Sequence, residues 1–240
     1  MCGIGGFYAP PGGHVDRQLM ATLWTALEDR GRHAAGVSLF WRNSDVPVAF
    51  KSAKPASRMV EDIQSRMGRN TQFIALHTRY TTQGSTENNN NNHPVCRAGI
   101  MLTHNGVIRN DANVFSSLGV DRAYDVDTEC IVAGLAVKGP TWTFNKINGS
   151  ASVAWIDTIT NPEVVNLFTN GKNPLVIGRL LDGTVVWASC SRHLEQLPIA
   201  TYWHAVPGKI YSLLPDGTIE HEHVAGKWPE PMWDGYARVY

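Results

Sequence analysis

The chain has 240 residues, of which 43% are hydrophobic and 18% charged, a composition typical of a globular protein that buries its core without disulfide or metal staples. Its 21 basic and 21 acidic residues cancel, so bulk charge gives no reason to expect a nucleic-acid or membrane partner. No apolar run approaches the roughly 18 residues of a membrane-spanning helix, and we find no secretory signal. The four cysteines form no CxxC pair, which predicts a reduced, cytoplasmic protein without metal or cofactor.

The first stretch, 2–8, predicts a short glycine-rich strand with a cysteine directly after Met1. Once Met1 is removed, Cys2 carries a thiol with a reference pKa of about 8.5 and a free α-amine of about 7.7–8.0. The amine can then serve as the base for the thiol beside it, which an internal cysteine lacks because its nitrogen is acylated. The alternative is an ordinary buried thiol, the usual state of a free cysteine.

The rest of the first half predicts two helices among several strands. Asp16 is expected to cap a helix that runs to about Arg30. After a loop over 30–36, the pattern predicts strands at 37–41, 46–51 and 73–76, with a short helix at 59–67. The last strand leads into the polar stretch 77–84. The five asparagines at 88–92 are expected in an exposed loop, because such a run has no apolar side chain to bury.

The second half is dominated by strands. A buried strand at 100–103 ends in His-Asn-Gly, which by itself predicts a turn. A helix is expected to open at 127–129 and run through Ala136. Further strands are predicted at 151–156, 164–168, 175–177, 185–188, 210–213 and 218–221. Few long helices and many hairpins predict an α+β fold with sheet packed on sheet, in a single domain over 1–240.

Three polar positions suit a reaction at a thiol, which needs donors for an oxyanion and groups that hold the substrate. Asn105 and Gly106 offer an amide and an unhindered backbone N–H, although Asn-Gly is more often a plain turn. Arg79 can clamp a carboxylate, whereas a loop arginine is usually just solvated. Asp127 can pair with an ammonium group, although its spacing suits a helix N-cap better.

Taken together, five blocks resemble, in order, those of the class II glutamine amidotransferases, amino-terminal-nucleophile hydrolases that include the glutaminase domains of glucosamine-6-phosphate synthase and glutamine phosphoribosylpyrophosphate amidotransferase. The start MCGIGG is similar to the start of that family, and the segment RGRHAAG at 30–36 to its Arg-Gly-x-x-(Ser/Ala)-Ala-Gly block. The segment HTRYTTQG at 77–84 resembles the family's His-Thr-Arg-Trp-Ala-Thr-His-Gly block. His-Asn-Gly at 104–106 and Asp-Thr-Glu at 127–129 complete the set, and the resemblance spans roughly residues 1–215.

This resemblance implies a four-layer αββα sandwich of the Ntn-hydrolase type and a glutaminase that acts through Cys2 as nucleophile and base. It implies that Asn105 and Gly106 form the oxyanion hole and that Arg30 braces the strand of the nucleophile. The Cys2 thiolate would attack the side-chain amide of L-glutamine, release ammonia and leave a γ-glutamyl thioester for water to hydrolyse.

The resemblance also assigns the substrate contacts. Arg79 would hold the α-carboxylate of glutamine and Asp127 its α-ammonium group, while Thr82 and the backbone of Tyr80 would line the pocket. The chain departs from the family pattern by Tyr80 in place of Trp, by Gln83 in place of His and by the asparagine run, which lengthens the loop expected to close over glutamine.

The other cysteines have no role in the resemblance. Cys190 stands where an acidic residue is common in the family, and it is left without a role. Cys96 and Cys130 are expected to be core thiols.

Only about 25 residues follow the last matched block, too few for a synthase domain, so we expect a free-standing glutaminase that supplies a separate synthetase or other ammonia-acceptor subunit. The aromatic and prolyl tail 225–240 is expected to pack on the sandwich, or else to dock that subunit. Two alternatives stay open: a hydrolase of γ-glutamyl amides or peptides, and a catalytically silent subunit that senses glutamine.

Overall fold

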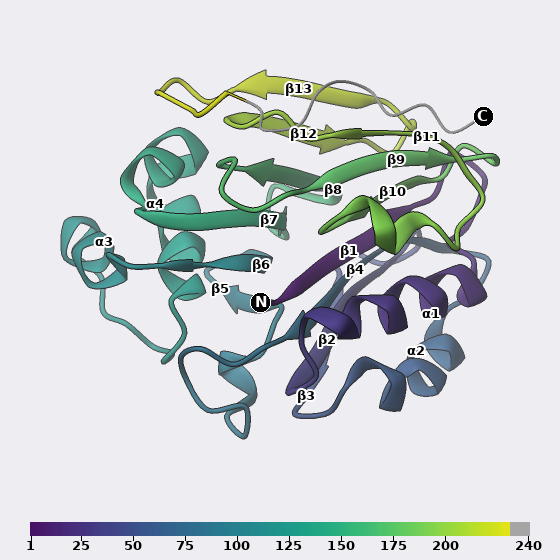
Figure 1. Ribbon diagram of the computed structural model, residues 1–240, viewed down its shortest axis with the longest axis horizontal. Helices are drawn as coiled ribbons and strands as arrows, with labels where there is room; N and C mark the ends of the chain where they lie inside the picture. The colour runs from purple at the N-terminus through teal and green to yellow at the C-terminus, as the bar shows by residue number, and fades with distance from the viewer. Residues whose placement is uncertain (231–240) are drawn as a thin grey trace.

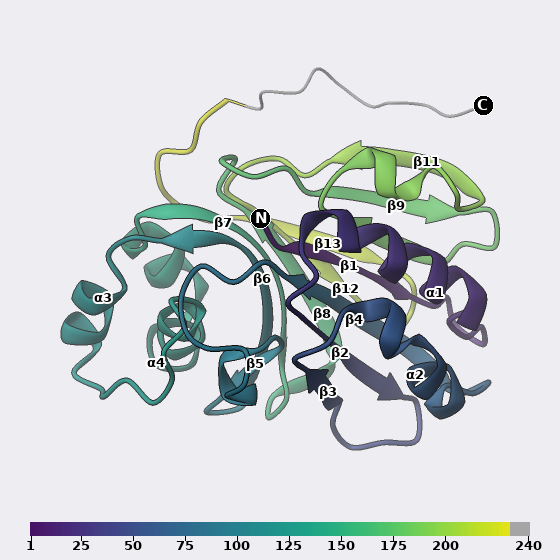
Figure 2. The same ribbon diagram turned by 60° about the horizontal axis from the view of Figure 1, so that its bottom comes forward.

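Two antiparallel sheets lie face to face in the computed structural model, which describes residues 1–230, and a pair of helices covers the outer face of each sheet (Figures 1 and 2). Three apolar clusters fill the spaces between these layers. One lies under the first helix pair, one between the sheets and one under the second pair. The four-layer order confirms the predicted αββα sandwich.

The first sheet has seven strands in the order β11-β9-β10-β1-β4-β2-β3. Its central strand, β1, pairs with β10 and β4, so that Gly5 lies opposite Ala188 on one side and Leu76 on the other. The amino terminus therefore enters the fold in the middle of a sheet. The strands of this sheet are β1 Gly3–Tyr8, β2 Ala34–Trp41, β3 Val48–Ser52, β4 Thr71–Arg79, β9 Val176–Leu180, β10 Val185–Ala188 and β11 Ile199–His204.

The second sheet has six strands in the order β13-β12-β8-β7-β6-β5. Strands β6 and β7 pair along their whole length, from Ile100 opposite Asp157 to Ile108 opposite Gly149. The strands of this sheet are β5 Val95–Arg97, β6 Ile100–Ile108, β7 Gly149–Asp157, β8 Asn161–Thr169, β12 Lys209–Leu213 and β13 Ile219–His223.

The helices are α1 Arg17–Ala26 and α2 Val60–Arg66 on the first sheet, and α3 Asp111–Leu118 and α4 Thr128–Lys146 on the second. Helix α1 begins where the sequence predicts, because Asp16 Oδ1 accepts hydrogen bonds from the backbone N–H groups of the first turn, at 2.7 and 2.9 Å. A 3₁₀ turn, Leu27–Arg30, continues it. Helix α4 kinks at Gly139, where φ is 76° and Pro140 follows. No helix within residues 1–230 is both long and apolar enough to cross a membrane.

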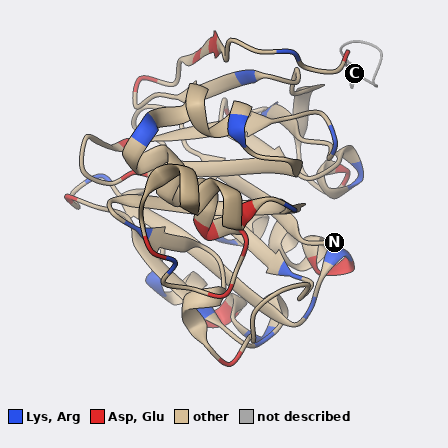
Figure 3. Ribbon diagram, turned by 90° about the vertical axis from the view of Figure 1, so that its left-hand side faces the viewer, with Lys and Arg blue, Asp and Glu red and all other residues tan. Residues whose placement is uncertain are grey.

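Charged residues of both signs are interspersed along the ribbon in the view of Figure 3. Part of the aromatic tail is visible in the fold. Trp228 packs edge-on against Phe168, with ring centroids 5.4 Å apart, and its Nε1 donates to the carbonyl of Val224. The other aromatic residues of the predicted tail, Trp233, Tyr236 and Tyr240, lie outside the described residues.

Two segments that were predicted to form a loop or a turn after a strand are instead part of the strand. Strand β4 runs on through His77, Thr78 and Arg79, and β6 runs through His-Asn-Gly to Ile108, so the turn predicted there is wrong. The reason is nonlocal, because Asn105 and Gly106 each pair with a residue of β7 in the ladder. The ladder overrides the turn preference of the dipeptide. Strands β5 and β11 and helix α3 were not predicted.

The asparagine run is only half exposed, which corrects its assignment to an open loop. Asn91 and Asn92 are fully buried. Asn92 Oδ1 accepts a hydrogen bond from Arg79 Nη1 at 2.7 Å, and its Nδ2 donates to the carbonyl of Thr86 at 2.8 Å. Asn91 Oδ1 accepts from the backbone N–H of Asp125 at 2.9 Å. These amides act as internal braces, because an asparagine side chain satisfies buried donors and acceptors at once.

Strand β1 offers a test of this packing at Gly6. A Cβ atom there would overlap the indole of Trp187 and the carbonyl of Ile74. We expect Gly6→Ala to lower the free energy of unfolding by about 1–3 kcal/mol or more, because neither neighbour can move without opening the core. Gly68→Ala is the matched control, since its Cβ would meet only the side-chain oxygen of Asn70, at 3.1 Å. Urea unfolding measures both, and equal midpoints would contradict this packing.

Candidate active site

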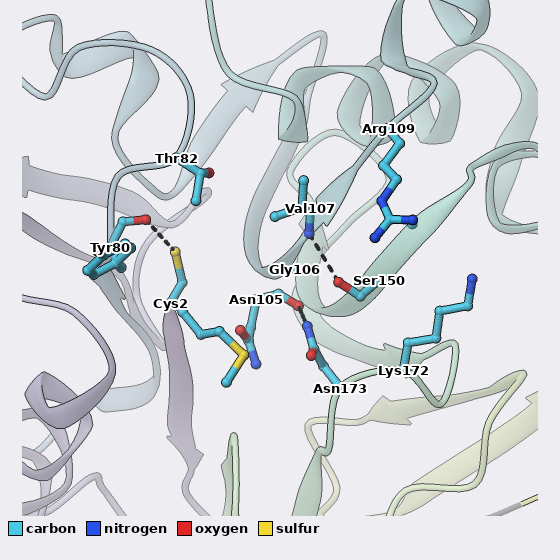
Figure 4. Close-up of a pocket in the computed structure, with 12 residues that line it drawn as sticks. Cys2, Tyr80, Thr82, Asn105, Gly106, Val107, Arg109, Ser150, Lys172 and Asn173 are labelled. Atoms are coloured by element: carbon cyan, nitrogen blue, oxygen red, sulfur yellow. Dashed lines mark hydrogen bonds between the residues drawn. The ribbon is translucent and has the colours of Figure 1, made fainter.

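A pocket of about 510 Å³ opens where the amino terminus meets strands β6 and β7 (Figure 4). Its volume lies in the range of small-molecule sites. Of the residues predicted for the site, Cys2, Tyr80, Thr82, Asn105 and Gly106 line it, whereas Arg30, Arg79 and Asp127 do not. The remaining lining residues are Met1, Val107, Arg109, Gly149, Ser150, Lys172 and Asn173.

Cys2 lies on the Tyr80 side of this pocket, and its thiol donates a hydrogen bond to the carbonyl of Tyr80 at 3.6 Å. Burial raises the pKa of the Cys2 thiol and Asp127 acts in the same direction, while the amino-terminal charge and Arg79 lower it. The net effect is a protonated thiol that needs a base before it can attack. Met1 is 69% exposed, so the residue that blocks the Cys2 amine is open to solvent.

The turn after α1 fixes both Cys2 and the Tyr80 side of the pocket. Arg30 Nε donates to the carbonyl of Cys2 at 2.8 Å. At Gly31 a Cβ atom would overlap the backbone that joins Arg79 to Tyr80, so only glycine lets the two chains approach this closely. The Arg-Gly pair therefore sets the position of Cys2 relative to the Tyr80 carbonyl.

Asn105 is fully buried beside Cys2, yet its side-chain oxygen and nitrogen have no hydrogen-bond partner among the described residues. Its backbone carbonyl accepts from Asn173 Nδ2 at 2.9 Å, which holds the strand in place. A Cβ atom at Gly106 would overlap the carbonyl of Ser150. A buried amide without a partner costs about 1–3 kcal/mol, and a bound oxygen atom would recover that cost.

Arg79 lies behind the pocket wall and is 2% exposed. Its guanidinium donates to Asn92 and to the carbonyls of Gln83 and Gly84, the last at 2.9 Å. An arginine has five N–H donors, so two remain without a partner among the described residues. The sequence placed this residue on a loop, and the structure places it at the buried end of β4.

Asp127 precedes α4 but makes no capping hydrogen bond, so the N-cap interpretation is wrong for its side chain. Its Oδ2 accepts instead from the backbone N–H of Ile108 at 2.6 Å, which ties it to the end of β6. The carboxylate is 4% exposed. The negative charge of Asp127 raises the pKa of the Cys2 thiol and the positive charge of Arg79 lowers it.

Three histidines form a buried cluster behind Asn105. The hydroxyl of Thr128 lies 2.9 Å from His104 Nδ1 and 3.0 Å from His93 Nε2, so it bridges the two rings. His77 Nε2 lies 3.1 Å from the carbonyl of His104, and the rings of His77 and His93 stack at 4.0 Å. Burial lowers the pKa of all three, that of His77 to about 3, so all are neutral at pH 7. The cluster links β4 and β6 to α4 without adding charge.

Sequence reasoning missed part of the pocket. Arg109 and Lys172 line it, both are exposed, and no acidic residue lines it with them. The sequence signal that could have identified Arg109 and Lys172 is their position next to predicted elements. Arg109 follows Gly106 by three residues, and Lys172 lies three residues before the strand predicted at 175–177.

The remaining cysteines differ in environment. Cys130 is buried, as expected, whereas Cys96 and Cys190 are partly exposed, so Cys96 is not a fully buried core thiol. Within residues 1–230, no group of three or more His, Cys, Asp or Glu side chains is arranged to hold a metal ion.

Comparison with known proteins places this site in context. A family model described as a glutamine amidotransferase domain matches residues 77–196, half of the chain. The glutamine–fructose-6-phosphate aminotransferase (isomerizing) of Corynebacterium glutamicum is 30% identical over 143 residues, which cover 57% of this chain and 23% of that protein. The chain thus spans about a quarter of this curated relative.

Two solved structures share the fold. The glutamine phosphoribosylpyrophosphate amidotransferase of B. subtilis, complexed with ADP and GMP, superposes with a TM-score of 0.72 at 19% identity, over 95% of this chain and 50% of that one. A glutamine aminotransferase class-II domain protein from Silicibacter pomeroyi gives a TM-score of 0.57 at 12% identity, over 94% of this chain and 100% of that one.

The histidine cluster predicts a stability loss in mild acid. The folded pKa of His77 is about 3 against an ordinary 6.5, so between these values the unfolded chain binds a proton that the folded chain does not. The free energy of unfolding should therefore be highest above pH 6.5. Below pH 6.5 it should decrease by about 1.4 kcal/mol per pH unit for each such histidine. Urea unfolding from pH 7.5 to 5 measures this, and His77→Gln should reduce the slope. A flat profile would refute the assignment.

Proposed function

The chain belongs to the glutamine amidotransferase domain family, as its motifs indicated, and we propose that it hydrolyses the side-chain amide of L-glutamine through a thioester on Cys2. One observation carries the proposal. Cys2 shares a pocket with Asn105, whose buried side-chain amide has no partner among the described residues. A sulfur nucleophile beside an unused donor is the arrangement that acyl transfer requires.

The reaction begins with removal of Met1, which frees the α-amine of Cys2. The amine takes the thiol proton, and the thiolate attacks the δ-carbonyl carbon of glutamine. Asn105 Nδ2 and the backbone at Gly106 stabilise the negative charge that develops on the carbonyl oxygen. The C–N bond breaks, the proton passes to the departing nitrogen, and ammonia leaves. Water then hydrolyses the γ-glutamyl thioester and restores the thiol.

The substrate contacts are proposed on the charges around the thiol. Arg79 binds the α-carboxylate with its two unused N–H groups, and Asp127 binds the α-ammonium group. Tyr80 and Thr82 form the wall of the pocket, and Arg30 is a positioning residue that holds Cys2. Because Asn92 and two loop carbonyls also bind the Arg79 guanidinium, binding of glutamine and the order of this loop are coupled.

We further propose that the ammonia serves a separate acceptor enzyme. The support is that this fold covers the whole solved chain of the S. pomeroyi glutamine aminotransferase class-II domain protein. The presence of Cys2, Asn105, Gly106 and Asp127 together favours this enzyme over a silent glutamine-sensing subunit.

A second candidate function is supported by Arg109 and Lys172. Both line the pocket across Asn105 and Gly106 from Cys2, and neither cationic side chain has a hydrogen-bond or ion-pair partner among residues 1–230 (Figure 4). A γ-glutamyl dipeptide carries a carboxylate on its leaving group, which two cations at this position would attract. The same Cys2 chemistry would then hydrolyse γ-glutamyl peptides.

Substitution of the site residues tests the main proposal. We expect Cys2→Ala to abolish glutamate release from glutamine, and Asn105→Ala to lower kcat by about 10²–10³-fold through loss of the oxyanion donor. Asn113→Ala, an exposed change on α3, is the control and should keep full activity. Intact mass on the same sample establishes the state of Met1. Unaltered turnover in Cys2→Ala, or full activity in protein that retains Met1, would overturn the mechanism.

A substrate panel tests the second function. If Arg109 and Lys172 bind the leaving group, kcat/KM for γ-glutamylglycine should exceed that for γ-glutamylmethylamide, which has the same bond without the carboxylate. The doubly substituted Arg109→Gln, Lys172→Gln enzyme should lose about fivefold on the dipeptide, the scale of an exposed ion pair, and keep its rate on glutamine. Equal kcat/KM values for the two amides would contradict the second function, and glutamine hydrolysis would remain as the proposed activity.

A further inference from the structure

A second thiol in the chain has its own base. Cys190 follows strand β10 and begins the 3₁₀ turn Ser191–Leu194, whose third residue is His193. Cys190 Sγ lies 3.3 Å from His193 Nδ1. His193 Nε2 lies 3.1 Å from Asp29 Oδ1, in the turn after α1. Thiol, imidazole and carboxylate thus form a continuous chain between segments more than 160 positions apart in the sequence.

The hydrogen bonds fix where the protons lie. The Asp29 carboxylate accepts a hydrogen bond from His193 Nε2, so Nε2 carries the ring proton. His193 Nδ1 is then left with a lone pair that faces the thiol. His193 is 3% exposed. Burial lowers its pKa, although Asp29 raises it, so the ring is neutral and able to accept a proton at pH 7. A base oriented by a third group is the arrangement that activates nucleophilic side chains.

We propose that Cys190 is a second nucleophilic thiol, activated by His193 and Asp29, and that it reacts with small hydroperoxides. His193 Nδ1 takes the thiol proton, and the sulfur attacks the distal oxygen of the peroxide. The O–O bond breaks, the proton passes to the departing oxygen, and the products are a cysteine sulfenic acid and an alcohol or water. The sulfur is oxidised and the peroxide reduced, with no other reactant.

The surroundings of Cys190 suit a small reactant. Cys190 is partly exposed. It does not line the pocket of Cys2, so this site and the proposed glutaminase site are separate. The adjacent cavity, of about 250 Å³, includes Ser191, the next residue, and its other walls are mainly apolar: Leu194, Glu195, Leu197, Ile199 and Tyr202.

Cys96 provides an internal control, because it is also partly exposed but its thiol donates only to the carbonyl of Pro94, at 3.6 Å. In a Cys2→Ala background, the full chain is treated with hydrogen peroxide and dimedone, and separately with iodoacetamide. Peptide mass spectrometry then gives the labelling rate of each cysteine. We expect Cys190 to react about tenfold faster than Cys96, because of the two thiols only Cys190 has an imidazole at hydrogen-bond distance.

Two variants connect that difference to the proposed base. His193→Gln removes it, and Asp29→Asn weakens its orientation at a carboxylate that is 40% exposed. Both should bring the Cys190 rate down toward that of Cys96, while Ser191→Ala should leave it unchanged. Equal rates for the two cysteines in the parent chain, or an unchanged Cys190 rate in folded Asp29→Asn, would overturn the proposal. Neither outcome depends on glutamine hydrolysis.

Discussion

The burial of β1 in the centre of a sheet is the constraint on which the site depends. All six residues of this strand are buried, with β10 on one side and β4 on the other, so the residue just before it cannot move freely. Glycine at position 6 lets Trp187 cross the strand. A chain terminus usually frays, but here the sheet holds it. Core packing of β1 therefore sets where Cys2 lies, and the Arg30-Gly31 turn holds it relative to the carbonyl of Tyr80.

The amide beside the thiol is left without a partner, while the residues behind it are tied together. The Asn105 side chain has no hydrogen-bond partner among the described residues, whereas His93 and His104 share the hydroxyl of Thr128. Such an amide is stable only on a rigid support, because a flexible strand would turn it toward a carbonyl or water. The neutral cluster supplies that support without placing another charge beside Arg79 and Asp127.

The sequence predicted what local chemistry decides. Asp16 caps α1 because a cap involves only its own first turn, and the layered fold follows from the strand pattern. The sequence-based predictions were wrong where a segment far away in the sequence determines the local structure. His-Asn-Gly stays in β6 because β7 pairs with it, and Asp127 leaves the cap to bind Ile108. Arg109 and Lys172 line the same pocket only after β6 and the segment before β9 have folded together, so their spacing in the sequence does not predict that they lie in one site.

The two partly exposed thiols with assigned chemistry, at positions 2 and 190, differ in where a base can come from. Cys190 has an imidazole at hydrogen-bond distance, whereas within residues 1–230 the only hydrogen-bond partner of Cys2 Sγ is the carbonyl of Tyr80, which cannot accept a proton at neutral pH. The neutral histidines cannot replace it, since none of their ring nitrogens lies at hydrogen-bond distance from Cys2 Sγ in the described part of the chain. Burial raises the pKa of the Cys2 thiol further. The proposed Cys2 nucleophile therefore depends on its own α-amine as the base, and the proposal makes removal of Met1 a precondition of the reaction.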